Sequence, residues 1–252
     1  MRLAHRIDGP DDAPVLVLSN SIGSNWRMWD GLVPALTARF RVLRYDQRGH
    51  GDSETPNGPY TIADLAGDLI ELLDELGIDR PHLAGLSLGG MTGMWLAAHQ
   101  PSRVDRLALL CTSALLGPAK MWVERAALVR AEGTVVIADA GVRRWLTEEF
   151  IADHPEVAAW CRDMMTGTPA EGYAGCCEAI AAMDLRPDLP TITAPTLVIA
   201  GADDPATPPS HAEVIAAGIP GAALRIVPHA AHLATVEQPA AITDLLLRHF
   251  GG

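Results

Sequence analysis

Pro81-His82-Leu83-Ala84-Gly85-Leu86-Ser87-Leu88-Gly89-Gly90-Met91 holds a serine in a G-x-S-x-G frame. In this frame, glycines let the backbone turn sharply from a buried strand into a helix, so that the serine is held in a strained conformation with its hydroxyl exposed. A side chain at Gly85 or Gly89 would crowd the turn. The stretch therefore predicts a nucleophile at Ser87, between a strand and a helix.

Strand-like and helical segments alternate along the rest of the chain. Strands are expected over residues 3–7, 15–18, 41–45, 81–86, 104–110, 196–200 and 224–227. Turn residues 8–11 separate the first two, which favours a hairpin. Helices are expected over 61–76, behind a capping box of Thr61 and Asp64, and over about 237–249. This alternation predicts an α/β fold with a mostly parallel sheet flanked by helices.

Residues 117–190 break the alternation. The stretch reads as helical pieces, with four of the eight methionines and three of the six tryptophans and no clear strand. We interpret it as a helical cap inserted into an α/β core formed by residues 1–116 and 191–252. A chain of 252 residues with 48% hydrophobic residues is long enough for one such core with an insertion.

The composition of the chain argues against several classes of protein. No run of about 18 apolar residues occurs, and the first residues lack the apolar core of a signal peptide, so we expect a soluble, cytoplasmic protein with no membrane partner. The formal net charge of −12 argues against a nucleic-acid partner. Cys111, Cys161, Cys176 and Cys177 lack metal-ligand spacing and are interpreted as buried thiols. The sequence is compatible with a homo-oligomer but does not determine the oligomeric state.

A serine hydroxyl needs a base within hydrogen-bond reach and a third group that orients the base. After a nucleophile elbow, the acid and then the histidine follow later strands. Asp204 stands after the strand over 196–200 in a G-x-x-D-x-x-x-P frame, and we prefer it as the acid to Asp203, which we expect to cap the turn or face solvent. His232 follows the last strand and is the expected base, with His229 and His211 as rivals.

Two backbone N–H groups are needed to stabilise the oxyanion that forms when a carbonyl is attacked. The residue after the nucleophile, Leu88, supplies one of them. The other should come from the loop after the second strand, where Ser19-Asn20-Ser21-Ile22-Gly23 stands, and we choose Ile22.

Taken together, these motifs make the chain similar to the 3-oxoadipate enol-lactonases of the α/β-hydrolase superfamily. The resemblance is carried by the Asn-Ser loop at 18–23, the elbow at 85–95, the Gly-Cys-Cys segment within 172–180 and the Asp-Pro-Ala-Thr-Pro-Pro tail within 201–209. The segment Asp46-Gln47-Arg48-Gly49-His50-Gly51-Asp52-Ser53 is shared by many α/β-hydrolases. We expect Arg48 in it to form a structural ion pair, and take the segment as support for the fold only.

The resemblance implies a reaction without a metal or organic cofactor. Its substrate would be a five-membered enol-lactone with an acetate arm, opened by Ser87 with His232 as the base. For the arm, we favour Arg144 with Trp145 in the cap, because a guanidinium binds a carboxylate in a bidentate manner beside a stacking ring. The alternative is a solvated arginine next to a tryptophan that packs the cap onto the core.

Three other functions compete with this interpretation. A carbon-carbon bond hydrolase or a general carboxylesterase would use the same triad, although Leu233 stands where carbon-carbon hydrolases typically have a tryptophan after the histidine. A ligand receptor with an intact triad is a different class, and fold alone does not exclude it.

Overall fold

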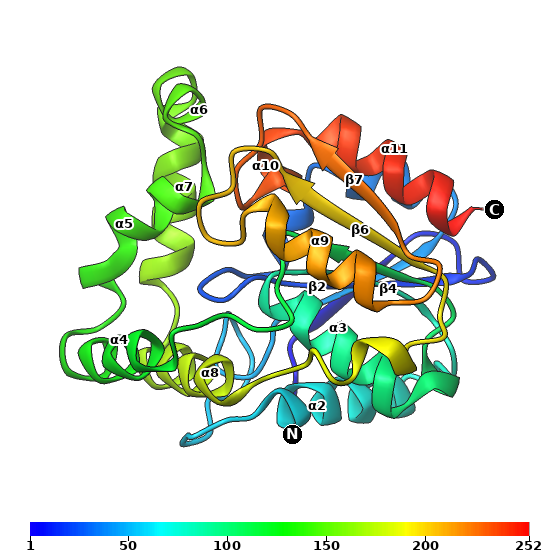
Figure 1. Cartoon of the computed structure of the whole chain (residues 1–252), viewed down its shortest axis with the longest axis horizontal. Helices are drawn as coiled ribbons and strands as arrows, with labels where there is room; N and C mark the ends of the chain where they lie inside the picture. The colour runs from blue at the N-terminus through cyan, green and yellow to red at the C-terminus, as the bar shows by residue number, and fades with distance from the viewer. Residues whose placement is uncertain (252) are drawn as a thin grey trace.

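The computed structural model describes residues 1–251, which form a seven-stranded sheet with helices on both faces (Figure 1). The strands are β1 (His5–Asp8), β2 (Val15–Ser19), β3 (Arg41–Tyr45), β4 (His82–Leu86), β5 (Leu107–Leu110), β6 (Thr196–Gly201) and β7 (Ala223–Val227). They lie in the order β1-β3-β2-β4-β5-β6-β7, and all pairings are parallel except that of β1 with β3. The predicted α/β class with a mostly parallel sheet is confirmed.

The predicted hairpin between the first two strands is wrong. β1 pairs with β3, with His5 opposite Tyr45, and β3 separates β1 from β2. The apolar strand β2 is buried and lies between two parallel neighbours, β3 and β4. On β1, Asp8 reaches the buried guanidinium of Arg44 on β3 at 2.7 Å. Pairing with β3 therefore gives the buried Arg44 a second carboxylate partner beside Asp30, which a hairpin of β1 with β2 would not provide.

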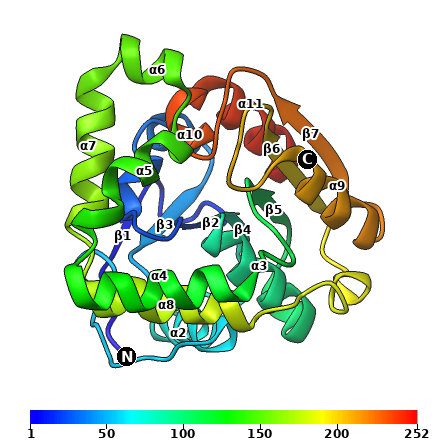
Figure 2. The same ribbon diagram turned by 60° about the vertical axis from the view of Figure 1, so that its left-hand side comes forward.

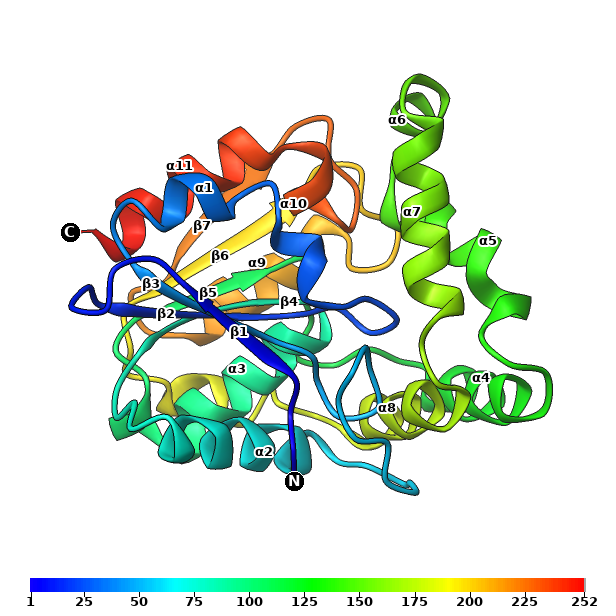
Figure 3. The same ribbon diagram turned by 180° about the vertical axis from the view of Figure 1, so that it is seen from behind.

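Helices cover the sheet in two layers. One face carries α2 (Ile62–Glu75), α3 (Leu88–His99) and α9 (Pro209–Gly218), and the other carries α1 (Val33–Leu36), α10 (Ala234–Glu237) and α11 (Pro239–Phe250) (Figure 3). Thr61 and Asp64 form the predicted capping box of α2. The last predicted helix is divided at Gln238, because the following Pro239 disfavours helical backbone in the residue before it.

A group of five helices lies beyond the carboxyl ends of the parallel strands, and we call it the cap (Figures 1 and 2). It consists of α4 (Ala119–Glu132), α5 (Val135–Trp145), α6 (Glu148–Asp153), α7 (Pro155–Thr166) and α8 (Ala170–Ala182). α4 and α8 lie side by side, and Arg130 of α4 binds both Glu171 and Glu178 of α8 at 2.5–2.9 Å. In the described part of the chain, no helix is both long and apolar enough to cross a membrane.

Candidate active site

Ser87 lies at the turn between β4 and α3, at the carboxyl edge of the sheet. Its backbone has φ 56° and ψ −114°, a conformation that L-residues rarely adopt. Two hydrogen bonds hold this strained residue: its N–H donates to the carbonyl of Leu110 at 2.9 Å, and the hydroxyl of Thr112 donates to its carbonyl at 2.7 Å. The elbow predicted from the sequence is therefore present, and hydrogen bonds hold it to β5 and to the residues after this strand.

The two glycines of the elbow are required because other backbone atoms lie too close to them to leave room for a side chain. A Cβ atom at Gly85 would lie 2.2 Å from the carbonyl oxygen of Gly89. A Cβ atom at Gly89 would lie 2.2 Å from the carbonyl oxygen of Ser19 at the end of β2. Because backbone atoms cannot yield as a flexible side chain can, any larger residue at either position would displace Ser87.

Asp204 and His232 come together from the loops after β6 and β7. One carboxylate oxygen of Asp204, Oδ2, lies 2.9 Å from Nδ1 of His232. The other, Oδ1, accepts the backbone N–H groups of Ala206 and Thr207, and the Thr207 hydroxyl donates to Oδ2 at 2.7 Å. Burial by itself raises the pKa of Asp204, but His232 and Thr207 together lower it to about 2. An ionised Asp204 keeps the proton on Nδ1 of His232 and leaves Nε2 as a base.

The competing residues do not contact this pair. Asp203 is exposed, and its backbone N–H donates to the carbonyl of Ala230. His229 is exposed as well, whereas His211 lines the same cavity as Ser87 and has its Nδ1 atom 2.8 Å from the hydroxyl of Ser113. Ser87 and His232 face that cavity together without a direct hydrogen bond among residues 1–251, and such bonds commonly tighten only when substrate binds.

Ile22 and Leu88 flank the nucleophile with free backbone N–H groups. Neither group has an acceptor within the part of the chain described here, while both neighbours are engaged: Gly23 N–H donates to Nε2 of His50 at 2.9 Å, and Gly89 N–H donates to the carbonyl of Asn20 at 2.9 Å. Ile22 lines the cavity with Ser87. The arrangement leaves two donors beside the serine, as an oxyanion hole requires.

The cavity between the core and the cap has a volume of about 420 Å³. Met121, Ile137 and Met165 contribute apolar walls, and Arg144 and Trp145 line it from α5. Trp145 is buried, and its carbonyl accepts the N–H of Leu233 at 2.8 Å, so it both lines the cavity and ties the cap to the loop of His232.

Sequence reasoning missed Arg125, which also lines the cavity. Its guanidinium lies 4.8 Å from the ring centroid of Trp122, three residues earlier on α4. Burial lowers the pKa of Arg144, and the positive charge of Arg125, which lines the same cavity, lowers it further. The i, i+3 spacing of Trp122 and Arg125 on one helical face was the signal that could have identified this residue.

A buried carboxylate joins the cap to the loop that carries His232. Oε1 of Glu237 accepts the backbone N–H and the hydroxyl of Thr147, each at 2.8 Å, just after α5. Oε2 of the same side chain accepts the backbone N–H of Ala231 at 2.5 Å. Together with the bond from Leu233 to Trp145, this carboxylate makes the end of α5 and the histidine loop one connected unit.

The four cysteines are free and buried, as the sequence predicts. Burial raises the pKa of Cys161 and of Cys177 to about 12, so these groups remain thiols at neutral pH. Across residues 1–251, no group of three or more His, Cys, Asp or Glu side chains is arranged to hold a metal ion.

His50 should make the stability of the fold sensitive to pH. Burial lowers its pKa from 6.5 to about 4, so between these values the unfolded chain binds more protons and the free energy of unfolding falls as the pH falls. From pH 7 to pH 5, the wild type should lose about 2 kcal/mol relative to His50→Gln, which does not titrate. Urea denaturation of both proteins at the two pH values measures this difference.

The comparison of the wild type with His50→Gln also cancels the opposing effect of Asp46 on the pH dependence of stability. Burial raises the pKa of Asp46 to about 6, so this group favours the folded state as the pH falls, and it does so in both proteins. Parallel loss of stability in the two proteins would contradict the prediction.

Comparisons with known proteins agree with this geometry. A profile of the alpha/beta hydrolase family matches residues 15–245. The chain is 43% identical to 3-oxoadipate enol-lactonase 2 of Acinetobacter baylyi, over 92% of this chain and 87% of that protein. The crystal structure of the enol-lactonase from Burkholderia xenovorans is 45% identical, with a TM-score of 0.97, and the match covers 99% of this chain and 96% of that one. A hydrolase from Pseudomonas aeruginosa matches with 48% identity and a TM-score of 0.96, over 99% of this chain and 94% of that one. The similarity therefore includes the core and the cap.

Proposed function

The chain belongs to the alpha/beta hydrolase family, and from this premise we propose that it is a carboxylic ester hydrolase that opens 3-oxoadipate enol-lactone to 3-oxoadipate. The observation that carries the proposal is the pair formed by Asp204 and His232 facing the same cavity as Ser87, in a chain closely similar to enol-lactonases. The proposed ligand is a small anionic lactone. The proposal includes a cytoplasmic location, which the free thiols of all four cysteines support.

In the first step, the hydroxyl of Ser87 attacks the lactone carbonyl while Nε2 of His232 takes the hydroxyl proton. The carbonyl oxygen becomes an oxyanion that the N–H groups of Ile22 and Leu88 stabilise. When the tetrahedral intermediate collapses, the bond to the ring oxygen breaks, and this oxygen takes the proton from His232 to become an enol that stays attached to the acyl-enzyme. An enol is a better leaving group than an alkoxide, and it tautomerises to a ketone, so ring opening is strongly downhill.

In the second step, a water molecule attacks the acyl-enzyme. His232 takes one proton from the water, the oxyanion forms at the same two N–H groups, and the ester bond to Ser87 breaks with return of the proton to the serine. The products are the free serine and a dicarboxylate with a ketone.

The acetate arm of the substrate needs a cationic partner because the chain as a whole is negatively charged. Arg144 and Arg125 line the cavity from two cap helices and provide two guanidinium groups. We assign the arm to this pair. Trp122, whose buried indole N–H has no hydrogen-bond partner within residues 1–251, adds a donor to the same wall.

Loss of the enol-lactone absorbance with purified protein tests the proposal directly, with 3-oxoadipate identified as the product. A neutral aryl ester serves as the comparison substrate. Rapid turnover of the lactone supports the proposal. Turnover of the ester alone would indicate a general carboxylesterase, and a stable complex with negligible turnover would indicate a ligand receptor.

Arg144→Ala should raise KM for the lactone about 10-fold to 100-fold, because a hydrogen bond to a charged group contributes about 1.5–3 kcal/mol. KM for the neutral aryl ester should change less than about 2-fold, since that substrate has no carboxylate. Initial rates over a range of both substrates measure the difference.

The neighbouring Arg143 provides the matched control. Both arginines are exposed, but Arg143 lines a separate surface pocket, so Arg143→Ala removes the same charge from α5 without changing the cavity. Equal effects of Arg144→Ala on lactone and ester, or equal effects of the two substitutions on the lactone, would refute the assignment of the arm.

A further inference from the structure

The segment over residues 46–53 follows β3 and packs against residues 20–26, which follow β2 and include Ile22. We call residues 20–26 the oxyanion loop and residues 46–53 the support segment. Three side chains of the support segment, Asp46, Gln47 and His50, form hydrogen bonds with backbone atoms of the oxyanion loop. These contacts involve the beginning, the middle and the end of the loop.

At the beginning of the loop, Nε2 of Gln47 donates to the carbonyl of Asn20 at 2.5 Å. The same carbonyl accepts the N–H of Gly89, the second residue of α3. One peptide oxygen therefore connects the support segment to the residue that follows Leu88. At the end of the loop, the carboxylate of Asp46 accepts the N–H of Trp26 at 2.8 Å.

In the middle, Nε2 of His50 accepts the N–H of Gly23 at 2.9 Å. Its other ring nitrogen, Nδ1, lies 3.1 Å from the carbonyl of Arg48. Because a carbonyl only accepts, Nδ1 must carry the proton and Nε2 must present a lone pair. Burial lowers the pKa of His50 to about 4, which keeps the ring neutral and the lone pair available at neutral pH.

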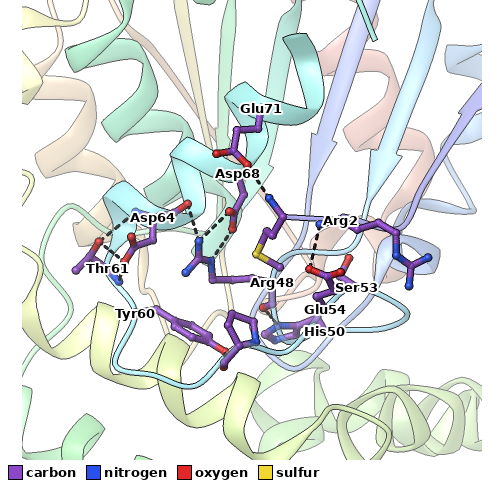
Figure 4. A network of polar contacts seen from close by, with 12 residues as sticks. Arg2, Arg48, His50, Ser53, Glu54, Tyr60, Thr61, Asp64, Asp68 and Glu71 are labelled. Atoms are coloured by element: carbon purple, nitrogen blue, oxygen red, sulfur yellow. Dashed lines mark hydrogen bonds and ion pairs between the residues drawn. The ribbon is translucent and has the colours of Figure 1, made fainter. Parts of the chain in front are cut away.

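Arg48 is itself fixed, as expected from the sequence. Its guanidinium forms two hydrogen bonds with the carboxylate of Asp68 on α2, at 2.5 and 2.8 Å, and Figure 4 shows this pair beside His50. On the other side of the segment, a Cβ atom at Gly49 would lie 2.2 Å from Cα of Gly172 on α8. The support segment is thus held between α2 and the cap and cannot move away from the oxyanion loop without breaking these contacts.

We propose that the support segment positions the oxyanion hole, and that His50 does so by holding the peptide between Ile22 and Gly23. Fixing the Gly23 N–H toward His50 restricts the backbone of Ile22 from one side, and so helps to hold the preceding peptide that carries the Ile22 N–H. His50 is a positioning residue, since it acts through the loop and does not touch the substrate. The inference rests on the proposed serine-hydrolase function and gives the segment a role beyond supporting the fold.

Two substitutions of His50 distinguish a role in positioning the oxyanion loop from a role in packing alone. In His50→Gln, the side-chain oxygen reaches the place of Nε2 and can accept the Gly23 N–H. In His50→Asn, the shorter side chain reaches only the place of Nδ1 and leaves that N–H without its acceptor. We expect His50→Asn to lower kcat about 10-fold to 100-fold with KM within about 2-fold of wild type, and His50→Gln to stay within about 3-fold in both constants.

An arylboronic acid that forms a tetrahedral adduct with Ser87 provides a second measurement. Its affinity should fall in His50→Asn in parallel with kcat, whereas binding of adipate, whose carboxylates form no tetrahedral adduct with the serine, should not change. His249→Asn controls for the loss of a histidine ring that contacts a backbone carbonyl away from the site, since the half-buried His249 contacts the carbonyl of Leu107 at the opposite end of the sheet. This variant should leave kcat within about 2-fold of wild type.

Equal kcat values for His50→Asn and His50→Gln, or unchanged boronate affinity in His50→Asn, would overturn the inference. If His50→Asn does not fold, Gln47→Glu tests the role of the support segment as a whole, because it keeps the shape of the side chain but replaces the donor to Asn20 with an acceptor, and an unchanged kcat in this variant would overturn the inference. All constants are measured with the lactone and with an aryl ester. If the wild type hydrolyses only the ester, the proposed substrate is wrong, and the ester constants still decide the role of His50.

Discussion

Ser87→Ala should lower kcat for the enol-lactone by at least about 10⁴-fold, because no acyl-enzyme forms without the serine oxygen. The substitution removes one oxygen atom at a residue whose backbone is held by Leu110 and Thr112, so the elbow should retain its conformation. Loss of lactone absorbance with the wild type and the variant at equal concentration measures the effect.

Binding controls for a damaged cavity in this experiment. The variant should bind adipate with an affinity within about 2-fold of the wild type, because the arginines that line the cavity are unchanged. Activity above about one percent of wild type would mean that another group is the nucleophile, and the mechanism proposed for Ser87 would have to be abandoned.

Asp204→Asn should lower kcat about 10³-fold to 10⁴-fold, the second large effect. An asparagine can present its NH₂ group to Nδ1 of His232, which then becomes an acceptor, so that the proton moves to Nε2 and the base is lost. The substitution also removes the negative charge that stabilises the imidazolium formed during the attack. KM should change little, since Asp204 is buried behind His232 and does not line the cavity.

Asp203→Asn is the matched control for this prediction. It makes the same chemical change one residue earlier, at an exposed side chain, and should leave kcat within about 2-fold of wild type. Comparable losses in both variants would mean that the loop after β6 tolerates neither change, and that the effect of Asp204→Asn does not report on the histidine.

The parts of the site that follow from local chain chemistry could be predicted from the sequence. The Gly85 and Gly89 spacing is a requirement of one tight turn, and the acid and base follow the ends of strands that the apolar pattern reveals. Asp204 was preferred to Asp203 from its spacing to Gly201, and the structure places Asp204 beside His232. The residues after the parallel strands meet because all these strands end at the same edge.

The features that the sequence did not reveal depend on contacts between distant segments. The pairing of β1 with β3 is favoured by the contact of Asp8 with Arg44, which no local pattern records. Arg125 reaches the cavity because α4 packs along α8, and the hydrogen bond of His50 with Gly23 joins two loops that lie side by side only after the sheet has formed. In each case the decisive interaction is long-range and involves a polar group whose partner is specified by tertiary packing.

The hydrogen bonds of Glu237 affect whether the cap and the α/β core of this enzyme can be exchanged separately. One oxygen of its carboxylate accepts two hydrogen bonds from Thr147 in the cap, and the other accepts one from Ala231 in the histidine loop. A minimal version trimmed to the α/β core would leave one oxygen of this buried carboxylate without its donors. The carboxylate that anchors the loop of the base through Ala231 would then be held from the core side alone, even for substrates too small to touch the cap. Redesign of the cap must therefore keep Thr147 or supply other donors to Glu237 in its place.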